Sequence, residues 1–319
     1  MTNPQFRLLN FQVKNEKGKG QRGRDNKEFI IQMFGMNESG ETCSIFVKNY
    51  TPFFYVKVAD HWGVREKRDF IKHLKMEIRK LALKEKYKKW SKRGQEVFPT
   101  PAKGDSEHAY ILRHQDDYIS YYENSILEKD SVIIERNKLY GFDNMKKHRF
   151  ICLKFKNTTA LNKVKNFWYI ITADPTSLFG RKYKLKHHRY QGVNTELYEA
   201  KLPPLLRYFH IKEINPSGWI EIPNDKIIEN TDRLKTYCKY EYTVDFKDIV
   251  PLPQKETPIP AIVASWDIEA SSSHGDFPLA IKTYRKLIGD IITYWKINKF
   301  IRTMDKNSQK SLIIKLINK

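Results

Sequence analysis

Residues 263–278 read VASWDIEASSSHGDFP, and the rest of the chain is organised around this stretch. The segment from Ile262 to Ile268 is apolar enough, and alternates well enough, to predict a buried strand. Continued on that strand, Asp267 and Glu269 are two residues apart, so both carboxylates point to one face. Burying two like charges together is costly, and a bound divalent cation offsets that cost. The pattern therefore predicts a site for Mg²⁺ or Mn²⁺, which prefer hard oxygen ligands.

Two interpretations of this pair of acids follow from the residues alone. An Asp-x-Glu on a strand is common, and most such pairs are solvated acids or acids on an edge strand. The loop from Ala270 to Gly275 is small and polar, which favours a ligand site, because a backbone with small side chains can run close to a ligand. On that interpretation, Asp267 and Glu269 are half of a two-metal site that cleaves phosphodiester bonds.

The charge of the chain indicates a polyanionic partner. Its 319 residues include 58 Lys and Arg against 37 Asp and Glu, which gives a formal net charge of +21. Such an excess fits nucleic acid or an anionic membrane surface. Much of the surplus is lysine, which the codon usage of an AT-rich genome also produces, so charge by itself does not decide between these explanations.

The cysteines and the apolar segments indicate an intracellular protein. Cys43, Cys152 and Cys238 are far apart, and no Cys-x-x-Cys pair suggests a zinc site or a disulfide framework. The N-terminus lacks the apolar core of a signal peptide, and no apolar run approaches membrane-spanning length. We therefore expect a soluble protein in a reducing compartment, with no membrane partner.

A meander of strands and a long basic helix open the chain. Strands are predicted over 4–14, 28–36, 42–48 and 53–58, a pattern that suits a small barrel or sheet. Residues 64–93 predict a helix, because apolar residues recur at three- and four-residue spacing along one face.

The other faces of this helix carry many cations. Four of them are candidate contacts to DNA phosphates: Lys72, Lys75, Arg79 and Lys80. The alternative is a solvated helix face, and the sequence does not separate the two, because lysine contacts to phosphate leave no sequence pattern.

Strands and helices alternate after the basic helix. Residues 148–156 predict a strand, and a helix capped by a threonine follows it. Residues 195–209 predict a helix interrupted by two consecutive prolines. His187 and His188 have no carboxylate or cysteine at ligand spacing, so we expect both on the surface.

Proline content marks the predicted domain boundary. Four prolines between Val250 and Pro260 predict a linker directly before the acidic strand. We therefore expect an N-terminal domain over 1–250, a Pro-rich linker over 251–260 and the start of a second domain over 261–319. The fold class is α+β, with barrel-like and strand-helix subdomains in the N-terminal part.

The stretch 263–278 as a whole resembles the first exonuclease motif of family B DNA polymerases, in the form found in large DNA viruses of eukaryotes. Further segments are similar to the N-terminal part of the family, and together they cover roughly residues 50–295. These segments are 53–56, 139–142, 149–151, 196–210 and 216–220. One departure is Ala200-Lys201-Leu202, which replaces the small-Asn-Ile of the family pattern.

The resemblance implies a fold and an activity. It implies a DNA-directed DNA polymerase, a nucleotidyltransferase whose RNase H-like 3′–5′ exonuclease domain opens at about Ala261. Asp267 and Glu269 would be two of its catalytic, metal-binding acids, with Mg²⁺ or Mn²⁺ as cofactor once the site is completed. The implied partners are primer–template or single-stranded DNA, the remaining C-terminal part of the polymerase and a processivity clamp. The implied location is a viral factory in the host cytoplasm, or the nucleus.

Several signatures of the family are absent from the sequence. Neither the Asn-x-x-x-Phe-Asp nor the Tyr-x-x-x-Asp segment, which carry further exonuclease acids, follows Asp276. The polymerase signatures Ser-Leu-Tyr-Pro-Ser-Ile and Tyr-Gly-Asp-Thr-Asp are missing too. We therefore expect the N-terminal part of a replicative polymerase, ending just inside the exonuclease domain and inactive alone. Two alternatives stay open: a non-catalytic DNA-binding or scaffold module, and a standalone RNase H-like nuclease with an unusual set of acids.

Overall fold

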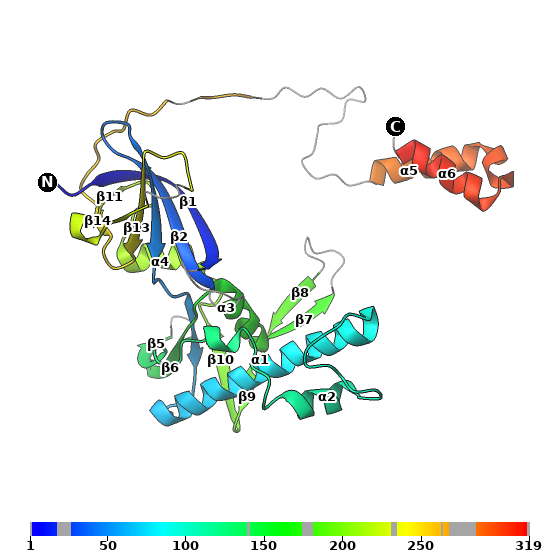
Figure 1. Cartoon of the computed structure of the whole chain (residues 1–319), viewed down its shortest axis with the longest axis horizontal. Helices are drawn as coiled ribbons and strands as arrows, with labels where there is room; N and C mark the ends of the chain where they lie inside the picture. Colours follow the sequence, from blue (N-terminus) through cyan, green and yellow to red (C-terminus); the bar gives the residue numbers. More distant parts are fainter. Residues whose placement is uncertain are drawn as a thin grey trace. The chain divides into compact units, whose positions relative to one another are not determined.

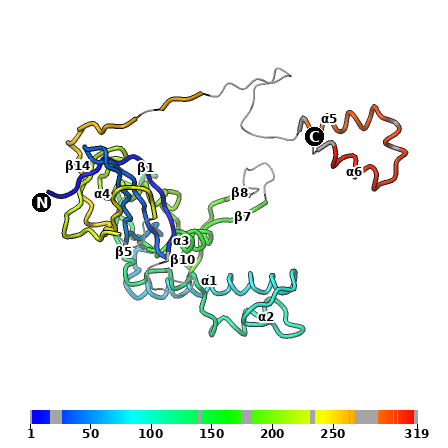
Figure 2. The backbone as a smooth tube through the Cα atoms, turned by 45° about the horizontal axis from the view of Figure 1, so that its top comes forward, coloured from blue at the N-terminus to red at the C-terminus, as the bar shows by residue number. Residues whose placement is uncertain are grey.

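The computed structural model describes residues 2–17, 27–138, 141–173, 181–230, 235–262, 264–267 and 285–317. These residues fall into two compact units, 1–261 and 262–319, which are described one at a time. The first unit contains two large β-sheets and their helices, and the described elements of the second unit are helical (Figures 1 and 2).

The first sheet of the first unit has seven strands. They lie in the order β12-β13-β3-β2-β1-β11-β14. Their bounds are β1 Gln5–Lys17, β2 Lys27–Met36, β3 Thr42–Lys48, β11 Trp219–Glu221, β12 Ile228–Glu229, β13 Tyr240–Asp245 and β14 Val250–Leu252. Only the β13–β3 pair is parallel among these neighbours. Helix α4 (Pro204–Lys212) packs on this sheet through the fully buried Tyr208, beside Ile31 and Ile45.

The second sheet has five strands, in the order β5-β6-β4-β10-β9. Their bounds are β4 Phe53–Lys57, β5 Val132–Asn137, β6 Lys147–Lys154, β9 His188–Tyr190 and β10 Val193–Tyr198. Helices α1 (Val64–Arg93) and α3 (Thr158–Lys165) cover it, and Phe54, Phe70 and Trp168 lie in the shared core. A separate hairpin joins β7 (Tyr169–Ala173) to β8 (Arg181–Leu185).

The boundaries of α1 follow from its sequence. At its start, the Gly63 N–H donates to the Glu66 carboxylate over 2.8 Å, which satisfies one of the free N–H groups of the first turn. At its end, Gly94 adopts a φ of 60°, a left-handed conformation that glycine enters without steric cost. The apolar face between them reaches as far as Leu83, the last buried residue of the helix.

Most elements predicted for the first unit are confirmed. The mixed α+β class, the four opening strands and the helix over 64–93 all agree with the structure. The helix predicted over 195–209 is wrong in its first part, where β10 pairs with β4 through Leu197 and Val56. The helix begins only at Pro204, because a proline fits the first turn of a helix but not its interior.

The second unit contains α5 (Arg285–Ile297), the short 3₁₀ helix η5 (Lys299–Thr303) and α6 (Lys306–Ile317). The strand predicted over 262–268 is not formed by residues 262 and 264–267, and Ile262 is 99% exposed. A strand is stabilised by hydrogen bonds to its neighbours, and no described strand pairs with this stretch. No described helix is long and apolar enough to cross a membrane.

The proline-rich segment is attached to the first unit over part of its length. Its first residues form β14, which pairs with β11. Further on, the carbonyl of Thr257 accepts hydrogen bonds from Trp219 Nε1 at 2.9 Å and from Arg7 Nη1 at 3.3 Å. The segment predicted as a linker is therefore held at these points by the seven-stranded sheet.

Candidate nucleic-acid interface and metal site

The two predicted metal-binding acids belong to the second unit. Asp267 is exposed, in a stretch without regular secondary structure, and Glu269 lies outside the described residues, as do 271–278. Within the described part of the chain, no three His, Cys, Asp or Glu side chains gather where they could hold a metal ion. The donor set of two carboxylates still fits Mg²⁺ by its chemistry. The roles of Asp267 and Glu269 therefore stay a prediction.

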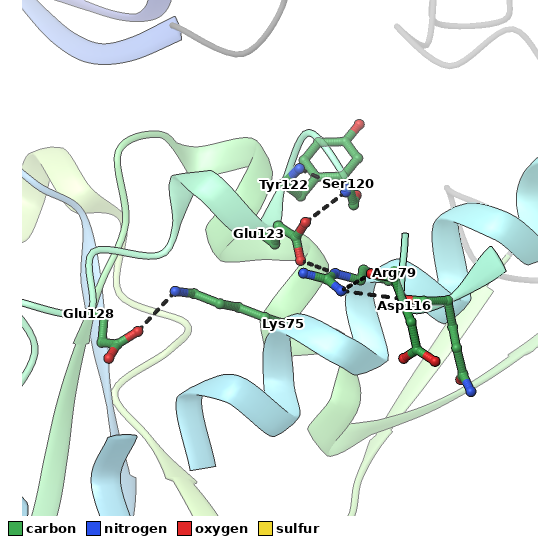
Figure 3. A network of polar contacts seen from close by, with 8 residues as sticks. Lys75, Arg79, Asp116, Ser120, Tyr122, Glu123 and Glu128 are labelled. Carbon is green, nitrogen blue, oxygen red and sulfur yellow. Dashed lines mark hydrogen bonds and ion pairs between the residues drawn. The ribbon is translucent and has the colours of Figure 1, made fainter. Parts of the chain in front are cut away.

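Arg79, one of the four candidate DNA contacts, is bound inside the first unit (Figure 3). Its Nε lies 2.6 Å from Oε2 of Glu123, whose side chain is only 3% exposed. Its Nη1 donates to the carbonyls of Gln115 and Asp116, each at 3.3 Å. The other carboxylate oxygen of Glu123 accepts the Ser120 N–H at 2.9 Å. Arg79 thus fixes the chain after α2 (Glu107–His114) against α1, which is a structural role.

The three lysines of the set differ in how far they are already paired. Lys75 Nζ lies 3.0 Å from the Glu128 carboxylate, as Figure 3 also shows, and Lys80 Nζ lies 3.0 Å from Glu77 on the same helix. Both pairs are partly exposed, and such pairs stabilise a protein little, so a phosphate could replace the carboxylate. Lys72 is exposed, and no ion pair joins it to an acid in the described parts of the chain. Phosphate contact stays a prediction for these lysines.

Arg207 is a buried cation that the charge pattern does not single out. It comes from α4, and its guanidinium lies over the rings of Phe53 and Tyr55, 4.4 and 5.5 Å from their centroids. Its Nη1 pairs with the Glu199 carboxylate at 2.6 Å. Because α4 packs on the seven-stranded sheet and Phe53 starts a strand of the other, Arg207 connects the two layers of the first unit. Arg207 lies within residues 196–210, one of the segments whose sequence resembles the family named above.

A histidine pair lies between α1 and β9. The Nε2 atoms of His73 and His188 are 3.1 Å apart, and both rings pack near Phe70. The ring of His73 also packs near Tyr190. Burial lowers the pKa of both imidazoles, and together with the nearby His73 it lowers the pKa of His188 to about 4. His187 is exposed as expected, but the surface position predicted for His188 is wrong, because β9 turns its side chain into this aromatic cluster.

We expect His188 to make the stability of the first unit depend on pH. The unfolded imidazole binds its proton near pH 6.5, but the folded one binds it only near pH 4. The free energy of unfolding should therefore be fully present above about pH 6.5 and fall as the pH drops toward 4. Urea unfolding at several pH values, for the wild type and for His188→Gln, measures this. Identical pH slopes for the two proteins would contradict the assignment.

Comparison with known proteins places the chain in a family. Residues 195–308 match the family model described as DNA polymerase family B, exonuclease domain, and this range includes Asp267 and Glu269. A DNA polymerase of Phaeocystis pouchetii virus is 38% identical over 85% of the chain. A DNA polymerase of Acanthamoeba polyphaga mimivirus is 25% identical, also over 85% of the chain.

A solved structure is also similar to the chain. It is the family B DNA polymerase of the archaeon Pyrobaculum calidifontis, with 12% identity and a TM-score of 0.39 over 78% of this chain and 21% of that one. The chain spans only 22% of the Phaeocystis virus polymerase and 13% of the mimivirus polymerase. The chain belongs to the family B DNA polymerases and corresponds to an N-terminal portion of their viral members.

Proposed function

We propose that the chain supplies the N-terminal part of a viral DNA-directed DNA polymerase with 3′–5′ proofreading activity. The observation that carries this proposal is the 38% identity to a viral DNA polymerase over 85% of the chain. The match to the family's exonuclease domain over 195–308 supports the proofreading part. The partners that follow are primer–template or single-stranded DNA, the rest of the polymerase and a processivity clamp, wherever the virus replicates its DNA in the host cell.

Within this proposal, Asp267 and Glu269 are the metal ligands that this chain contributes to the exonuclease site. Their carboxylates would bind Mg²⁺ or Mn²⁺ through oxygen, the ligand type that these ions prefer. A divalent cation bound there would stabilise the charge that develops on the scissile phosphate and activate the attacking water. The acids themselves would fix the cation and counter its charge, which requires both side chains to be ionised.

A second candidate function is a DNA-binding or scaffold module without catalysis of its own. It is favoured by the absence of the family's later exonuclease acids from the 319 residues. The two candidate functions differ in the activity expected of the isolated chain. In both, the chain is part of a longer DNA polymerase.

We expect the purified chain to show no primer extension and little or no trimming of a single-stranded 3′ end in Mg²⁺. Two carboxylates do not suffice to hold two metal ions about 4 Å apart and also position the attacking water. The measurement compares the chain with a complete polymerase that contains it, on labelled primers. Robust trimming by the chain alone that Asp267→Ala abolishes would favour a standalone nuclease. A complete polymerase that fails to extend primers would contradict the proposed function.

A further inference from the structure

Helix α1 continues well past the core that it covers. Its last buried residue is Leu83, and none of the residues over 84–93 is buried, although the helix runs on to Arg93. Figures 1 and 2 both show this end of α1 reaching beyond the five-stranded sheet, with α2 beside it. Because none of its residues is fully buried, this extension gains little from burial of an apolar face, which is the main source of helix stability in proteins.

The fold nevertheless holds this extension in place. The Tyr87 hydroxyl donates to the carbonyl of Asp105 over 2.6 Å, and its ring lies 5.7 Å from that of the fully buried Tyr110 on α2. Lys86 donates to the carbonyl of Phe98. The loop after α1 and the helix after that loop therefore brace the end of α1 from one side.

The cations of α1 differ along its length. Over the core, acids pair with Lys75, Arg79 and Lys80 but not with the exposed Lys72. At the start of the extension, Glu107 pairs with Lys84. At the far end, four exposed cations form no ion pair with an acid that the structure describes: Lys88, Lys89, Lys92 and Arg93. Residues 84–103 contain seven Lys and Arg against two Glu, of which Glu85 is paired with Lys163. The braced end of α1 thus carries a dense cluster of positive charges.

Helix stability alone does not account for this cluster. Cations in the last turn do interact favourably with the helix dipole, but the effect falls off within that turn. Lys88 and Lys89 lie a full turn before the C-cap Gly94, where the dipole adds little. In addition, the bracing loop exposes 82% of Phe98, although its backbone carbonyl is bound to Lys86. Exposed cations bind phosphates, and an exposed aromatic ring such as that of Phe98, on the loop that follows the helix, can stack on an unpaired base.

We propose that this surface binds single-stranded DNA. We call it the α1 tip: Lys88, Lys89, Lys92, Arg93 and Phe98. The cations contact successive phosphates, and Phe98 stacks on a base, which requires the base to be unpaired. The inference rests on the proposed function only in taking DNA as the nucleic acid, and it is independent of Asp267 and Glu269.

The test uses the full chain and a labelled oligothymidylate in EDTA, so that the outcome does not depend on nuclease activity. Fluorescence anisotropy gives the affinity at several salt concentrations for the wild type and for Lys88→Gln/Lys89→Gln/Lys92→Gln. Loss of three phosphate contacts should weaken binding about 100-fold at about 0.1 M salt and lower the log–log salt slope by about 2. Absence of wild-type binding at low salt would overturn the proposal.

A matched control removes the same charge elsewhere. Lys306, Lys310 and Lys315 are exposed on α6, so Lys306→Gln/Lys310→Gln/Lys315→Gln lowers the net charge equally. We expect this control to bind as the wild type does. An equal loss in both triple variants would overturn the proposal, because net charge alone would then explain binding. Replacing the three tip lysines by arginine should retain binding, and circular dichroism verifies that each variant is folded.

A third variant tests the aromatic part of the α1 tip. Phe98→Ala should weaken binding to the single strand by about fivefold or more and leave duplex binding unchanged, because only an unpaired base offers its face. Equal weakening for both forms of DNA, or no change for either, would contradict the stacking role of Phe98.

Discussion

Replacing Asp267 and Glu269 together by alanine in the complete polymerase should abolish excision of a mismatched 3′ end and leave primer extension near its normal rate. The two carboxylates are the proposed ligands of the exonuclease metals, so hydrolysis should fall about a thousandfold or more, which corresponds to roughly 4 kcal/mol of transition-state stabilisation. Synthesis should persist, because the polymerase signatures belong to another part of such an enzyme. Folding should not suffer, because Asp267 is exposed and lies in a stretch without regular secondary structure.

The measurement is excision and extension on matched and mismatched primers. Asp276→Ala is a suitable control, since this residue is an acid of the same stretch, 263–278, and no catalytic role is assigned to it. If the double variant still proofreads, Asp267 and Glu269 are not the metal ligands. If it loses extension and thermal stability together, the two acids are structural.

Arg79→Met should destabilise the first unit by about 3 kcal/mol, or about 10 °C in Tm. Methionine keeps most of the side-chain volume but leaves the carboxylate of Glu123, whose side chain is 3% exposed, without its cation. The carbonyls of Gln115 and Asp116 also lose a donor. The estimate is at the lower end for a broken buried pair, because Arg79 itself is 23% exposed.

Thermal unfolding, followed by circular dichroism, measures the effect against a matched control. Lys80→Met changes a neighbouring cation of α1 whose partner, Glu77, is partly exposed, and should cost less than about 0.5 kcal/mol. Adding Glu123→Gln to Arg79→Met should recover part of the loss, since the buried negative charge is then removed as well. An Arg79→Met variant of normal stability and reduced DNA affinity would instead identify Arg79 as a DNA contact.

The sequence predicts best where the deciding interactions are local. The helix over 64–93 is such a case, because its capping box, its apolar spacing and its C-terminal glycine all lie within the element. The segment 195–198 fails for the opposite reason. Its side chains suit either a helix or a strand, and only the pairing of Leu197 with Val56, far away in the chain, decides for the strand.

The candidate DNA contacts illustrate the same limit for charge. Lys72, Lys75, Arg79 and Lys80 are indistinguishable in the sequence, since each is a cation on the outer faces of one helix. What separates Arg79 from the others is Glu123, which is brought to it by a turn more than forty residues later. The cluster at the end of α1 is visible in the sequence, but its lack of acidic partners is a property of the fold.

The order of strands in the seven-stranded sheet also determines when the protein can fold during its synthesis. In the sheet, β1 pairs with β11, for example through Gln5 and Glu221, and β3 pairs with β13. The two outer strands of the opening meander, β1 and β3, therefore gain their second partner only after residues beyond 218 have been synthesised. The five-stranded sheet is built entirely from residues 53–198, and it should fold first on the ribosome. Until β11 and β13 leave the ribosome, β1 and β3 have unpaired edges, which can pair with strands of other chains. Slow translation between β10 and β13 should therefore favour aggregation of the nascent chain.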